Sequence, residues 1–264
     1  DDRAQATAVQ PDGKIVVAGY TNVLGSNDFF ILRFNVNGSL DSSFDNDGRV
    51  ILSGSGNDRA LAVALQLDGK IVVAGTTDVS GNNDFLIIRL TANGSVDGTF
   101  GSSGRQVING FGGNEQAQAV ALQTDGRIVV AGYTNAAGTN DFAVARLNTN
   151  GSLDISFDID GRVVISGFGG DDQAQAIAVQ PDGKIVLVGY TNVSGTNDFA
   201  VARLLAHGSL DATFDGDGRL ITRGFGNDDR ALATALQTDG KIVVAGYSNG
   251  AGTNDVAVAR YVGR

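Results

Sequence analysis

The stretch Ala174–Tyr190, AQAIAVQPDGKIVLVGY, decides the fold predicted for this chain. It begins with alternating small residues, turns at an Asp-Gly pair and continues as an unbroken apolar run. Alternation with a period of two is typical of a β-strand, and Asp-Gly between two such runs is a strong signal of a β-hairpin. Closely similar stretches begin at Ala4, Ala60, Ala117 and Ala231, so the sequence predicts five equivalent hairpins.

The hairpins recur at a fixed period. The aspartates of their Asp-Gly turns are separated by steps of 56, 57, 57 and 57 residues, at Asp12, Asp68, Asp125, Asp182 and Asp239. An Asn-Asp pair repeats in the same register, with its aspartate at Asp28, Asp84, Asp141, Asp198 and Asp255. A constant period of this kind indicates a repeat architecture. We therefore predict a single domain over residues 1–264, with repeats at about 1–56, 57–112, 113–169, 170–226 and 227–264.

The third repeat predicts four strands, at about residues 117–123, 127–133, 141–147 and 162–168. Short polar turns join the first three strands, and a longer Asn-, Gly- and Asp-rich connection, pinned by Leu153 and Phe157, leads to the fourth. Four antiparallel strands in up-and-down order form one blade of a β-propeller. The predicted fold class is therefore an all-β, five-bladed β-propeller of four-stranded antiparallel blades. A β-solenoid is the main alternative, although its coils are much shorter than this period.

The last repeat is incomplete. Fourth strands begin at Arg49, Arg105, Arg162 and Arg219, but the fifth repeat has no corresponding segment. The last blade is therefore expected to lack its outer strand, which leaves the edge Val256–Tyr261 open to pairing with a strand from a longer parent or from another chain. The chain also begins in the middle of a motif at Asp1, as expected of a mature product or an excised fragment.

Charge and composition exclude several classes of partner. The net charge of −10 disfavours nucleic acid and anionic membrane surfaces, which require a basic patch. No apolar run approaches the roughly 18 residues of a membrane-spanning helix, so direct membrane insertion is not expected. The chain has no cysteine, which excludes disulfides and cysteine-bound zinc. The single histidine, His207, occupies a turn position and is expected to be a turn residue, because other repeats hold asparagine there.

A composite signature connects these repeats to a known family. The pattern A-x-A-x-A-x-Q-x-D-G-[KR]-I-V-x-x-G is followed by N-D-F-x-x-x-R and G-S-L-D-x-x-F. It resembles the delta-60 repeat, a bacterial repeat of large secreted or surface proteins that is assigned to β-propellers. The resemblance covers essentially the whole chain and implies an extracellular or cell-surface location in a bacterium. It implies no catalytic residues, because the family carries no established activity.

Two sets of acidic residues are candidate cation sites. The first precedes each inner strand, and on the propeller prediction it would form an acidic ring around the axis: Asp2, Asp58, Glu115, Asp172 and Asp229. Such a ring would hold a cation or water, or its members would simply cap turns.

The second set lies in the long connections, which have the pattern D-x-x-x-D-x-D-G in three repeats. Its members are Asp41, Asp45, Asp47, Asp154, Asp158, Asp160, Asp211, Asp215 and Asp217. Closely spaced carboxylates beside a glycine suit calcium, the one candidate cofactor, although Asp-Gly turns also arise for steric reasons alone.

Arginine and tyrosine recur as well. The arginines of the third strand are expected to form an ion pair with an acid of the same blade, either Asp28 and its equivalents or the turn aspartates. They are Arg33, Arg89, Arg146, Arg203 and Arg260. Tyrosines that end the second strand, each with an asparagine two residues later, are a candidate glycan-binding set or an inward-packing ring. This set is Tyr20, Asn22, Tyr133, Asn135, Tyr190, Asn192, Tyr247 and Asn249.

Three classes of function stay open. We favour a non-enzymatic structural, adhesive or protein-interaction module of a larger secreted or cell-surface protein, because near-identical repeats offer equivalent sites for multivalent contact. The alternative is a lectin-like propeller that binds glycans at equivalent sites. The third class, a glycosidase, requires two acids with different roles, whereas the acids here recur symmetrically. The chain is therefore predicted not to be an enzyme.

Overall fold

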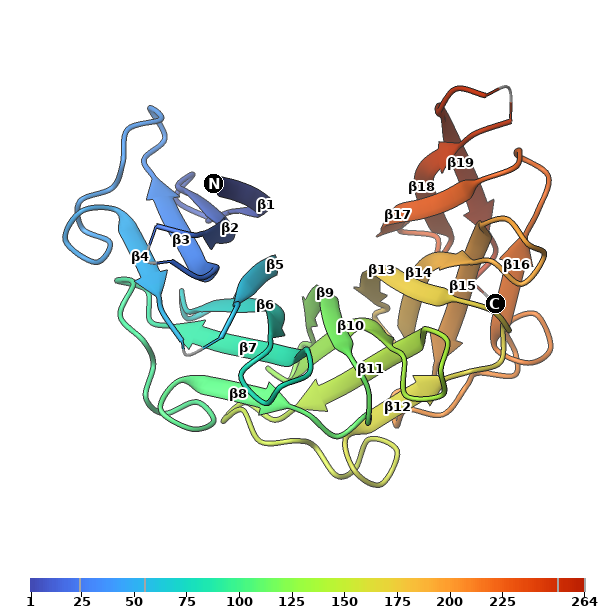
Figure 1. Cartoon of the computed structure of the whole chain (residues 1–264), viewed down its shortest axis with the longest axis horizontal. Coiled ribbons are helices and arrows are strands. Elements are labelled where there is room, and N and C mark those ends of the chain that lie inside the picture. Colours follow the sequence, from blue (N-terminus) through green and yellow to red (C-terminus); the bar gives the residue numbers. More distant parts are fainter. Residues whose placement is uncertain (24, 55, 251, 264) are drawn as a thin grey trace. The chain divides into compact units, whose positions relative to one another are not determined.

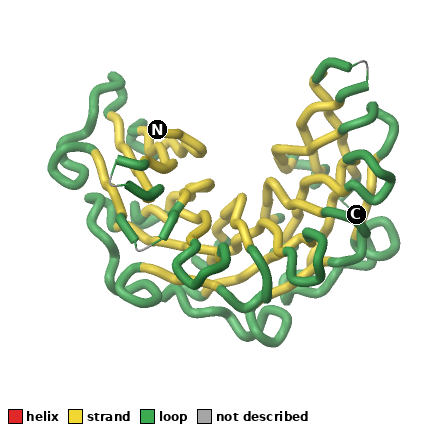
Figure 2. The backbone as a smooth tube through the Cα atoms, viewed as in Figure 1, coloured by secondary structure: helices red, strands yellow, loops and turns green. Residues whose placement is uncertain are grey.

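The structure is a computed structural model that describes residues 1–23, 25–54, 56–250 and 252–263. These residues form β-strands joined by turns and loops, with no helix in any of the described segments (Figures 1 and 2). Contacts divide the chain into two compact units, residues 1–128 with 147–152 and residues 129–146 with 153–264. The single domain over residues 1–264 therefore stays a prediction.

The described residues form nineteen strands in five sheets. The first sheet contains β1 (Asp2–Val9), β2 (Ile15–Thr21), β3 (Asp28–Phe34) and β4 (Arg49–Leu52). The second contains β5 (Arg59–Leu65), β6 (Ile71–Thr77), β7 (Asp84–Leu90) and β8 (Arg105–Ile108). The third contains β9 (Glu115–Leu122), β10 (Ile128–Thr134), β11 (Asp141–Leu147) and β12 (Arg162–Ile165). The fourth contains β13 (Asp172–Val179), β14 (Ile185–Thr191), β15 (Asp198–Leu204) and β16 (Arg219–Thr222). The fifth contains β17 (Asp229–Leu236), β18 (Ile242–Ser248) and β19 (Asp255–Tyr261).

Sequential strands are neighbours in every sheet, and the registered pairs are antiparallel. This is the up-and-down order predicted for a propeller blade. Four sheets have four strands and the last has three, so the predicted fold class is confirmed, including the missing outer strand of the last blade.

Local turn chemistry explains the first hairpin of each repeat. In the first repeat the carboxylate of Asp12 accepts a hydrogen bond from the Lys14 amide at 3.1 Å, and Gly13 adopts a φ of 82°. The Gln10 and Lys14 backbones close the turn with a 2.8 Å hydrogen bond. Glycine reaches positive φ without a steric penalty, so the Asp-Gly pair fixes the position of the turn and with it the strand register.

A β-bulge interrupts the inner strand of each repeat for which the register is given. In the fourth sheet the pairing with β14 shifts between Ala174 and Ala176. The partner of Ala174 is Gly189, and a Cβ atom built on Gly189 would overlap the carbonyl oxygen of Gln173. The glycine of the I-V-x-x-G motif is therefore required by a close approach of two backbones, because only glycine leaves that space open.

The core of the first unit lies between its first two sheets. It includes Val16, Ile31, Ile71 and Leu90, and Val63 and Leu65 of β5 pack against it. Phe44, from the connection between β3 and β4, is fully buried in the same cluster. The phenylalanine of the long connection thus anchors this loop to the core, as predicted for its equivalent in the third repeat.

The second unit has two apolar clusters. One includes Val144, Phe157, Phe168 and Leu187, and the other includes Val188, Phe199 and Val244. The first alanine of β13 and that of β17 are fully buried within these clusters. Small side chains on the inner strands therefore let neighbouring sheets of this unit approach closely.

Candidate functional site

Four arginines of the third strands form buried ion pairs with aspartates of the long connections. The Nε–Oδ2 distances are 2.7 Å for Arg33–Asp41, 2.8 Å for Arg89–Asp97, 2.7 Å for Arg146–Asp154 and 2.7 Å for Arg203–Asp211. All eight residues are at most 5% exposed. The ion pair predicted within each blade is confirmed in these four repeats, and its acid is the first aspartate of the connection.

Each arginine also contacts groups other than its aspartate. Arg146 donates from Nη2 to the Ser156 hydroxyl at 3.1 Å and from Nη1 to the carbonyl of Ala206, which belongs to the next repeat. Its guanidinium also lies over the Phe157 ring, 4.6 Å from the centroid. These partners offset the free energy that it costs to bury the guanidinium charge, which indicates a structural role for the arginine.

The pKa of Asp211 predicts how these ion pairs respond to acid. Burial alone would raise this pKa, but the Thr213 hydrogen bonds, Lys184 and the Arg203 charge outweigh it and lower the pKa from 3.8 to about 2. An acid whose pKa is lower in the folded state stabilises the fold above its unfolded pKa, so this contribution is present above about pH 4.

We expect the contribution, about 2 kcal/mol for Asp211, to disappear as the pH falls from 4 to 2. Urea unfolding across this range measures the free energy, and carboxyl NMR of Asp211 measures the pKa itself. A titration midpoint near 4 for this carboxyl would contradict the prediction.

In the predicted calcium loops, the first and third aspartates interact with other groups of the protein. Asp41, Asp154 and Asp211 are engaged by arginine, and the third aspartates cap the turn: the carboxylates of Asp47 and Asp160 accept from the amides two residues later at 2.9 Å. The middle aspartates Asp45, Asp158 and Asp215 adopt positive φ, and Asp215 and Asp217 are exposed with their neighbours in the turn. Among the residues that the structure describes, no three His, Cys, Asp or Glu side chains are grouped to hold a metal ion. Calcium in these loops stays a prediction that the geometry does not favour.

The loop tips contact the next repeat through main-chain atoms. The Asp45 amide donates to the carbonyl of Asn93 at 2.8 Å, and the Asp158 amide donates to the carbonyl of His207 at 2.9 Å. His207 therefore contributes its backbone to this contact, while its ring pairs with the hydroxyl of Ser209 at 2.7 Å. Both interactions suit a turn residue.

The tyrosines of the candidate glycan set pack inward. Tyr20 is 9% exposed and Tyr190 is 8% exposed. The Arg230 guanidinium lies 4.8 Å from the centroid of the Tyr190 ring, and the Tyr190 hydroxyl donates to Gln173 at 2.6 Å. A ring face that is covered by arginine is not free to stack on a sugar.

The asparagines of the same set lie at turns. The amide oxygen of Asn192 accepts from the Asp171 amide at 2.7 Å, and its backbone amide donates to the Asp171 carbonyl at 3.2 Å. The Asn249 amide makes the equivalent bond to Asp228 at 3.0 Å. Asn22 bonds to the amino group of Asp1, and Tyr133 and Asn135 also have partners. Tyr247 lies opposite Arg230 in the pairing of β17 with β18. The glycan-binding assignment of these residues stays a prediction.

Four of the five acids that precede the inner strands are buried. Asp2 is exposed, whereas the exposed fraction is 2% for Asp58, 1% for Glu115, 0% for Asp172 and 0% for Asp229. Burial raises the pKa of Asp58 and Glu115, and it raises the pKa of Asp172 to about 7. These acids belong to two separate compact units, so the axial ring stays a prediction.

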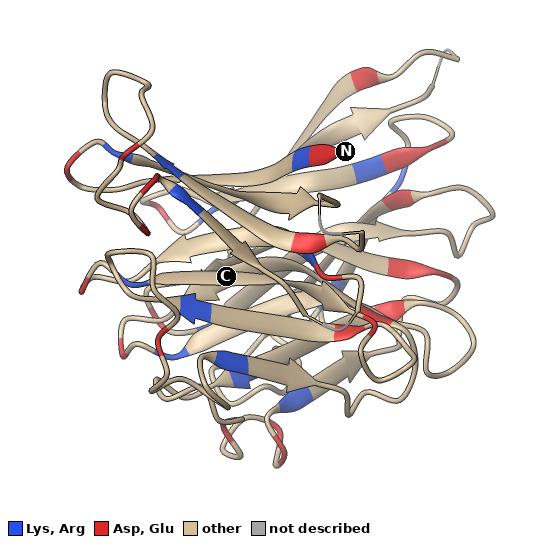
Figure 3. Ribbon diagram, turned by 60° about the vertical axis from the view of Figure 1, so that its left-hand side comes forward, with Lys and Arg blue, Asp and Glu red and all other residues tan. Residues whose placement is uncertain are grey.

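A second acid lies beside each buried one. The amide of Asp58 donates to the carbonyl of Asn27, directly before Asp28, at 2.7 Å, and the amide of Asp172 donates to the carbonyl of Asn140, directly before Asp141, at 2.7 Å. Figure 3 shows acidic residues at the ends of strands. The Asn-Asp aspartates were one of the two candidate sets for the arginine partners; in the four repeats with this ion pair they are not the partners, and they lie at the junction with the next repeat instead.

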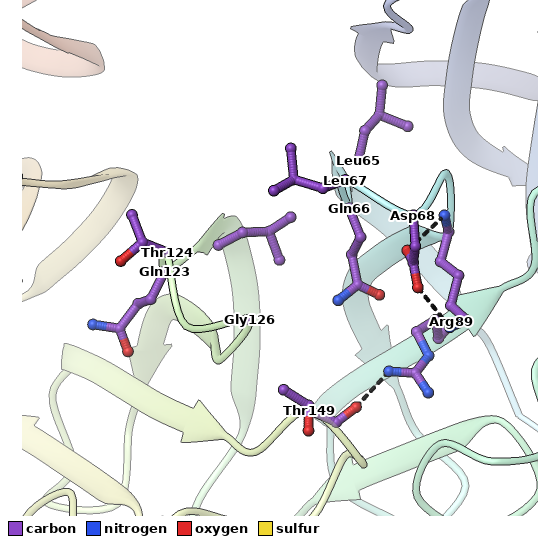
Figure 4. Close-up of a pocket in the computed structure, with 11 residues that line it drawn as sticks. Leu65, Gln66, Leu67, Asp68, Arg89, Gln123, Thr124, Gly126 and Thr149 are labelled. Atoms are coloured by element: carbon purple, nitrogen blue, oxygen red, sulfur yellow. Dashed lines mark hydrogen bonds and ion pairs between the residues drawn. The ribbon is translucent and has the colours of Figure 1, made fainter.

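A pocket of about 650 Å³ lies in the first unit between two Asp-Gly turns (Figure 4). Leu65, Gln66 and Leu67 line one side, and Gln123 and Thr124 line the other. Sequence reasoning missed this pocket; its one signal is the fully exposed Leu67, at a position where other repeats have proline or threonine.

The last strand, β19, is an open edge. Val256 is 87% exposed and Val258 is 55% exposed, whereas their equivalents in β15, Phe199 and Val201, are fully buried. Among the described strands β19 pairs with β18 alone. A hollow of about 510 Å³, lined by Phe225 and Val256 among others, lies beside the beginning of β19.

No helix in the described part of the chain is long and apolar enough to span a membrane.

Solved structures with a related chain path are distant in sequence. The native arabinanase Arb43A of Bacillus subtilis is 14% identical, with a TM-score of 0.48, and the match covers 98% of this chain and 96% of that one. Sqt1 from Chaetomium thermophilum is 10% identical, with a TM-score of 0.48, 97% of this chain and 69% of that one being covered. The α-L-arabinofuranosidase PaAbf62A from Podospora anserina, solved with cellotriose, is 11% identical, with a TM-score of 0.45. The match covers 98% of this chain and 90% of that one. No curated protein matches the sequence.

The sequence matches a family of repeats in all five predicted copies. The family is described as "Domain of unknown function (DUF5122) beta-propeller", and the matched residues are 10–44, 66–100, 123–157, 180–214 and 237–261. These segments include the Asp-Gly turns, the second and third strands and, in the first four copies, the loop with its buried ion pair. Together they make up more than half of the chain, which therefore belongs to the DUF5122 β-propeller family.

Proposed function

We propose that this chain is a non-enzymatic interaction module of a larger bacterial secreted or cell-surface protein, and that it binds a protein partner by strand addition at β19. The observation that carries the proposal is the open edge of the last blade. The other four blades end in outer strands of four residues, whereas β19 presents seven residues, including two exposed valines. Short outer strands protect a sheet edge from pairing, and a long apolar one invites it.

The pairing of β15 with β16 shows what such a partner would offer. Residues 199–202 pair with residues 222–219 in antiparallel register, and Phe225 packs beside Phe199 with ring centroids 5.1 Å apart. A partner strand with alternating apolar residues, followed by an aromatic residue, would supply both elements to β19.

A peptide that copies residues 161–168 (GRVVISGF), the fourth strand and phenylalanine of the third repeat, tests this proposal. We expect saturable binding of the labelled peptide to the chain, measured by fluorescence anisotropy. Val258→Lys places a charge on the edge and should weaken binding at least about tenfold, or about 1.4 kcal/mol. Val36→Lys, at an exposed turn, is the matched control. Absence of binding, or equal binding by both variants, would count against strand addition.

The location is a separate part of the proposal. The resemblance to the delta-60 repeat supports a secreted or surface protein, and the acidic net charge of −10 suits an exposed module. An antibody against this chain should label intact cells of the source bacterium; labelling that requires permeabilisation would contradict a surface location.

The contacts support a binding role over the other two classes. The Tyr190 ring is covered by Arg230, which disfavours the glycan-binding alternative. The acid pairs recur at equivalent positions of several repeats, whereas a glycosidase needs one general acid and one nucleophile or base in different surroundings. Hydrolysis of arabinan or another polysaccharide by the purified chain would overturn the non-enzymatic assignment.

A further inference from the structure

The junctions between successive repeats contain buried carboxylates without hydrogen-bond donors. Asp28 and Asp172 are both 0% exposed, and among the described residues no group donates a hydrogen bond to either carboxylate; the Thr191 hydroxyl, which lowers the pKa of Asp172, donates to the carbonyl of Gly169 at 2.9 Å instead. One oxygen of Asp58 is also buried without a partner. Leaving an ionised carboxylate buried and unpaired is strongly unfavourable, so these oxygens require a positive charge or a proton.

The junctions bring two acids together, as at Asp84 and Glu115, where Asp84 raises the pKa of Glu115 after the larger effect of burial. Asp28 lies beside Asp58 and raises its pKa, and Asp141 does the same to Asp172, after the larger effect of burial. At the first junction the Arg105 charge opposes this rise only in part. At the second, Asp171 adds a further negative charge, while its own carboxylate accepts from the amides of Asn140 and Asn192.

The other two junctions provide protein donors to both of their acids, and one oxygen of Glu115 and one of Asp229 stay buried without a partner. Ser80 donates to Asp84, and the amides of Gly112 and Gly113 donate to Glu115 at 2.9 and 3.3 Å. Ser194 donates to Asp198 in the same way, and the Gly226 amide donates to Asp229 at 3.2 Å. The sequence has Leu24 and Ala137 where these serines stand, so the first and third repeats have no side-chain donor at that position.

At one junction, a cationic side chain of the protein lies beside the Asn-Asp aspartate. The Nε atom of Arg223 lies 3.4 Å from the carboxylate of Asp198. Other repeats have Ser53, Asn109 and Ser166 at this position. Where the protein provides a cation at a junction, it therefore directs this cation at the Asn-Asp aspartate.

We propose that the junctions Asp28–Asp58 and Asp141–Asp172 each bind one calcium ion. Two carboxylates and nearby carbonyl, hydroxyl and water oxygens suit calcium, which accepts six to eight oxygen ligands in flexible geometry. Magnesium dehydrates reluctantly and fits such a site less well. The absence of a third acid among the described residues predicts weak binding, on the order of 10⁻⁴–10⁻³ M, as in extracellular modules. This inference goes beyond the proposed function and concerns how the blades are held together.

Equilibrium dialysis of the chelator-treated chain against calcium, read by atomic absorption, gives the stoichiometry, and calorimetry gives the thermal midpoint. We expect two calcium ions per chain and a rise in the midpoint on the order of 3 °C per site at a tenfold excess over Kd, with a smaller effect of magnesium. Asp28→Asn and Asp172→Asn should each remove one ion, and the double variant should bind none. Asp229→Asn, at the junction where Arg223 and Ser194 already contact Asp198, is the matched control and should still bind two.

Ser166→Arg covers the case in which Asp172→Asn fails to fold. It copies Arg223 into the third junction and should remove one calcium ion while keeping the thermal midpoint at or above that of the calcium-free chain. No calcium-dependent shift at about 10 mM, ten times the weakest expected Kd, would overturn the proposal. Undiminished binding by the double variant would do so as well, because calcium would then bind elsewhere, for example at the loop aspartates.

Discussion

Replacing Arg146 with methionine is expected to lower the free energy of unfolding by about 3–5 kcal/mol, because it removes the arginine partner of a buried carboxylate. Arg146 is 5% exposed, and its Nε atom lies 2.7 Å from Asp154, itself 4% exposed. The substitution also removes the contact with the Phe157 ring and the hydrogen bond to the carbonyl of Ala206. Chemical denaturation at pH 7 measures the loss.

The fifth repeat provides a matched control for this experiment. Arg260 has the same place in β19 but is exposed in the structure. Arg260→Met should change stability by less than about 0.5 kcal/mol. The double variant Arg146→Met with Asp154→Asn should recover part of the loss, because it removes the buried carboxylate charge together with the arginine charge. A loss below 1 kcal/mol for Arg146→Met alone would show that the ion pair is not a structural requirement.

Gly75→Ala is expected to destabilise the first unit by about 3 kcal/mol or more, because the new methyl group would collide with main-chain atoms. A Cβ atom at Gly75 would overlap the carbonyl oxygen of Arg59 on the paired strand β5. A flexible side chain could move away from such a clash, but the carbonyl is held in the β5–β6 ladder. Thermal unfolding followed by circular dichroism gives the change.

Gly98 is the appropriate comparison for Gly75. It belongs to the same repeat, has no positive φ, and a Cβ atom there would meet nothing within 4 Å. Gly98→Ala should therefore leave the thermal midpoint unchanged within a few degrees. Equal behaviour of the two variants would contradict the argument that the backbones at Gly75 approach too closely for a side chain.

The sequence was sufficient to predict the strands and their order, because these depend on local chemistry. The Asp12-Gly13 turn fixes the first hairpin through a glycine at positive φ and a carboxylate that accepts from the Lys14 amide. The same pattern recurs at a constant period, so one correctly interpreted repeat determined all five. Comparing the repeats with one another also predicted that the last repeat lacks its fourth strand.

Contacts between repeats were harder to predict. Periodicity shows that Asp28 and Asp58 recur, but not that a residue of one repeat faces one of the next. For Arg33 the sequence left two kinds of partner open, Asp28 or a turn aspartate, and did not choose between them; the partner is Asp41, eight residues after the arginine. Burial decided the outcome, because Asp41 comes from a loop that folds back over the arginine.

The main-chain contacts at the loop tips have an evolutionary consequence. The amides of Asp45, Gly101 and Asp158 bond to carbonyls of the following repeat at Asn93, Asn150 and His207. A carbonyl is present whatever the side chain, so this attachment survives substitution, as the histidine among asparagines illustrates. A duplicated segment of one period would carry both halves of the attachment with it. Gene duplication could therefore lengthen such an array without inventing a new interface.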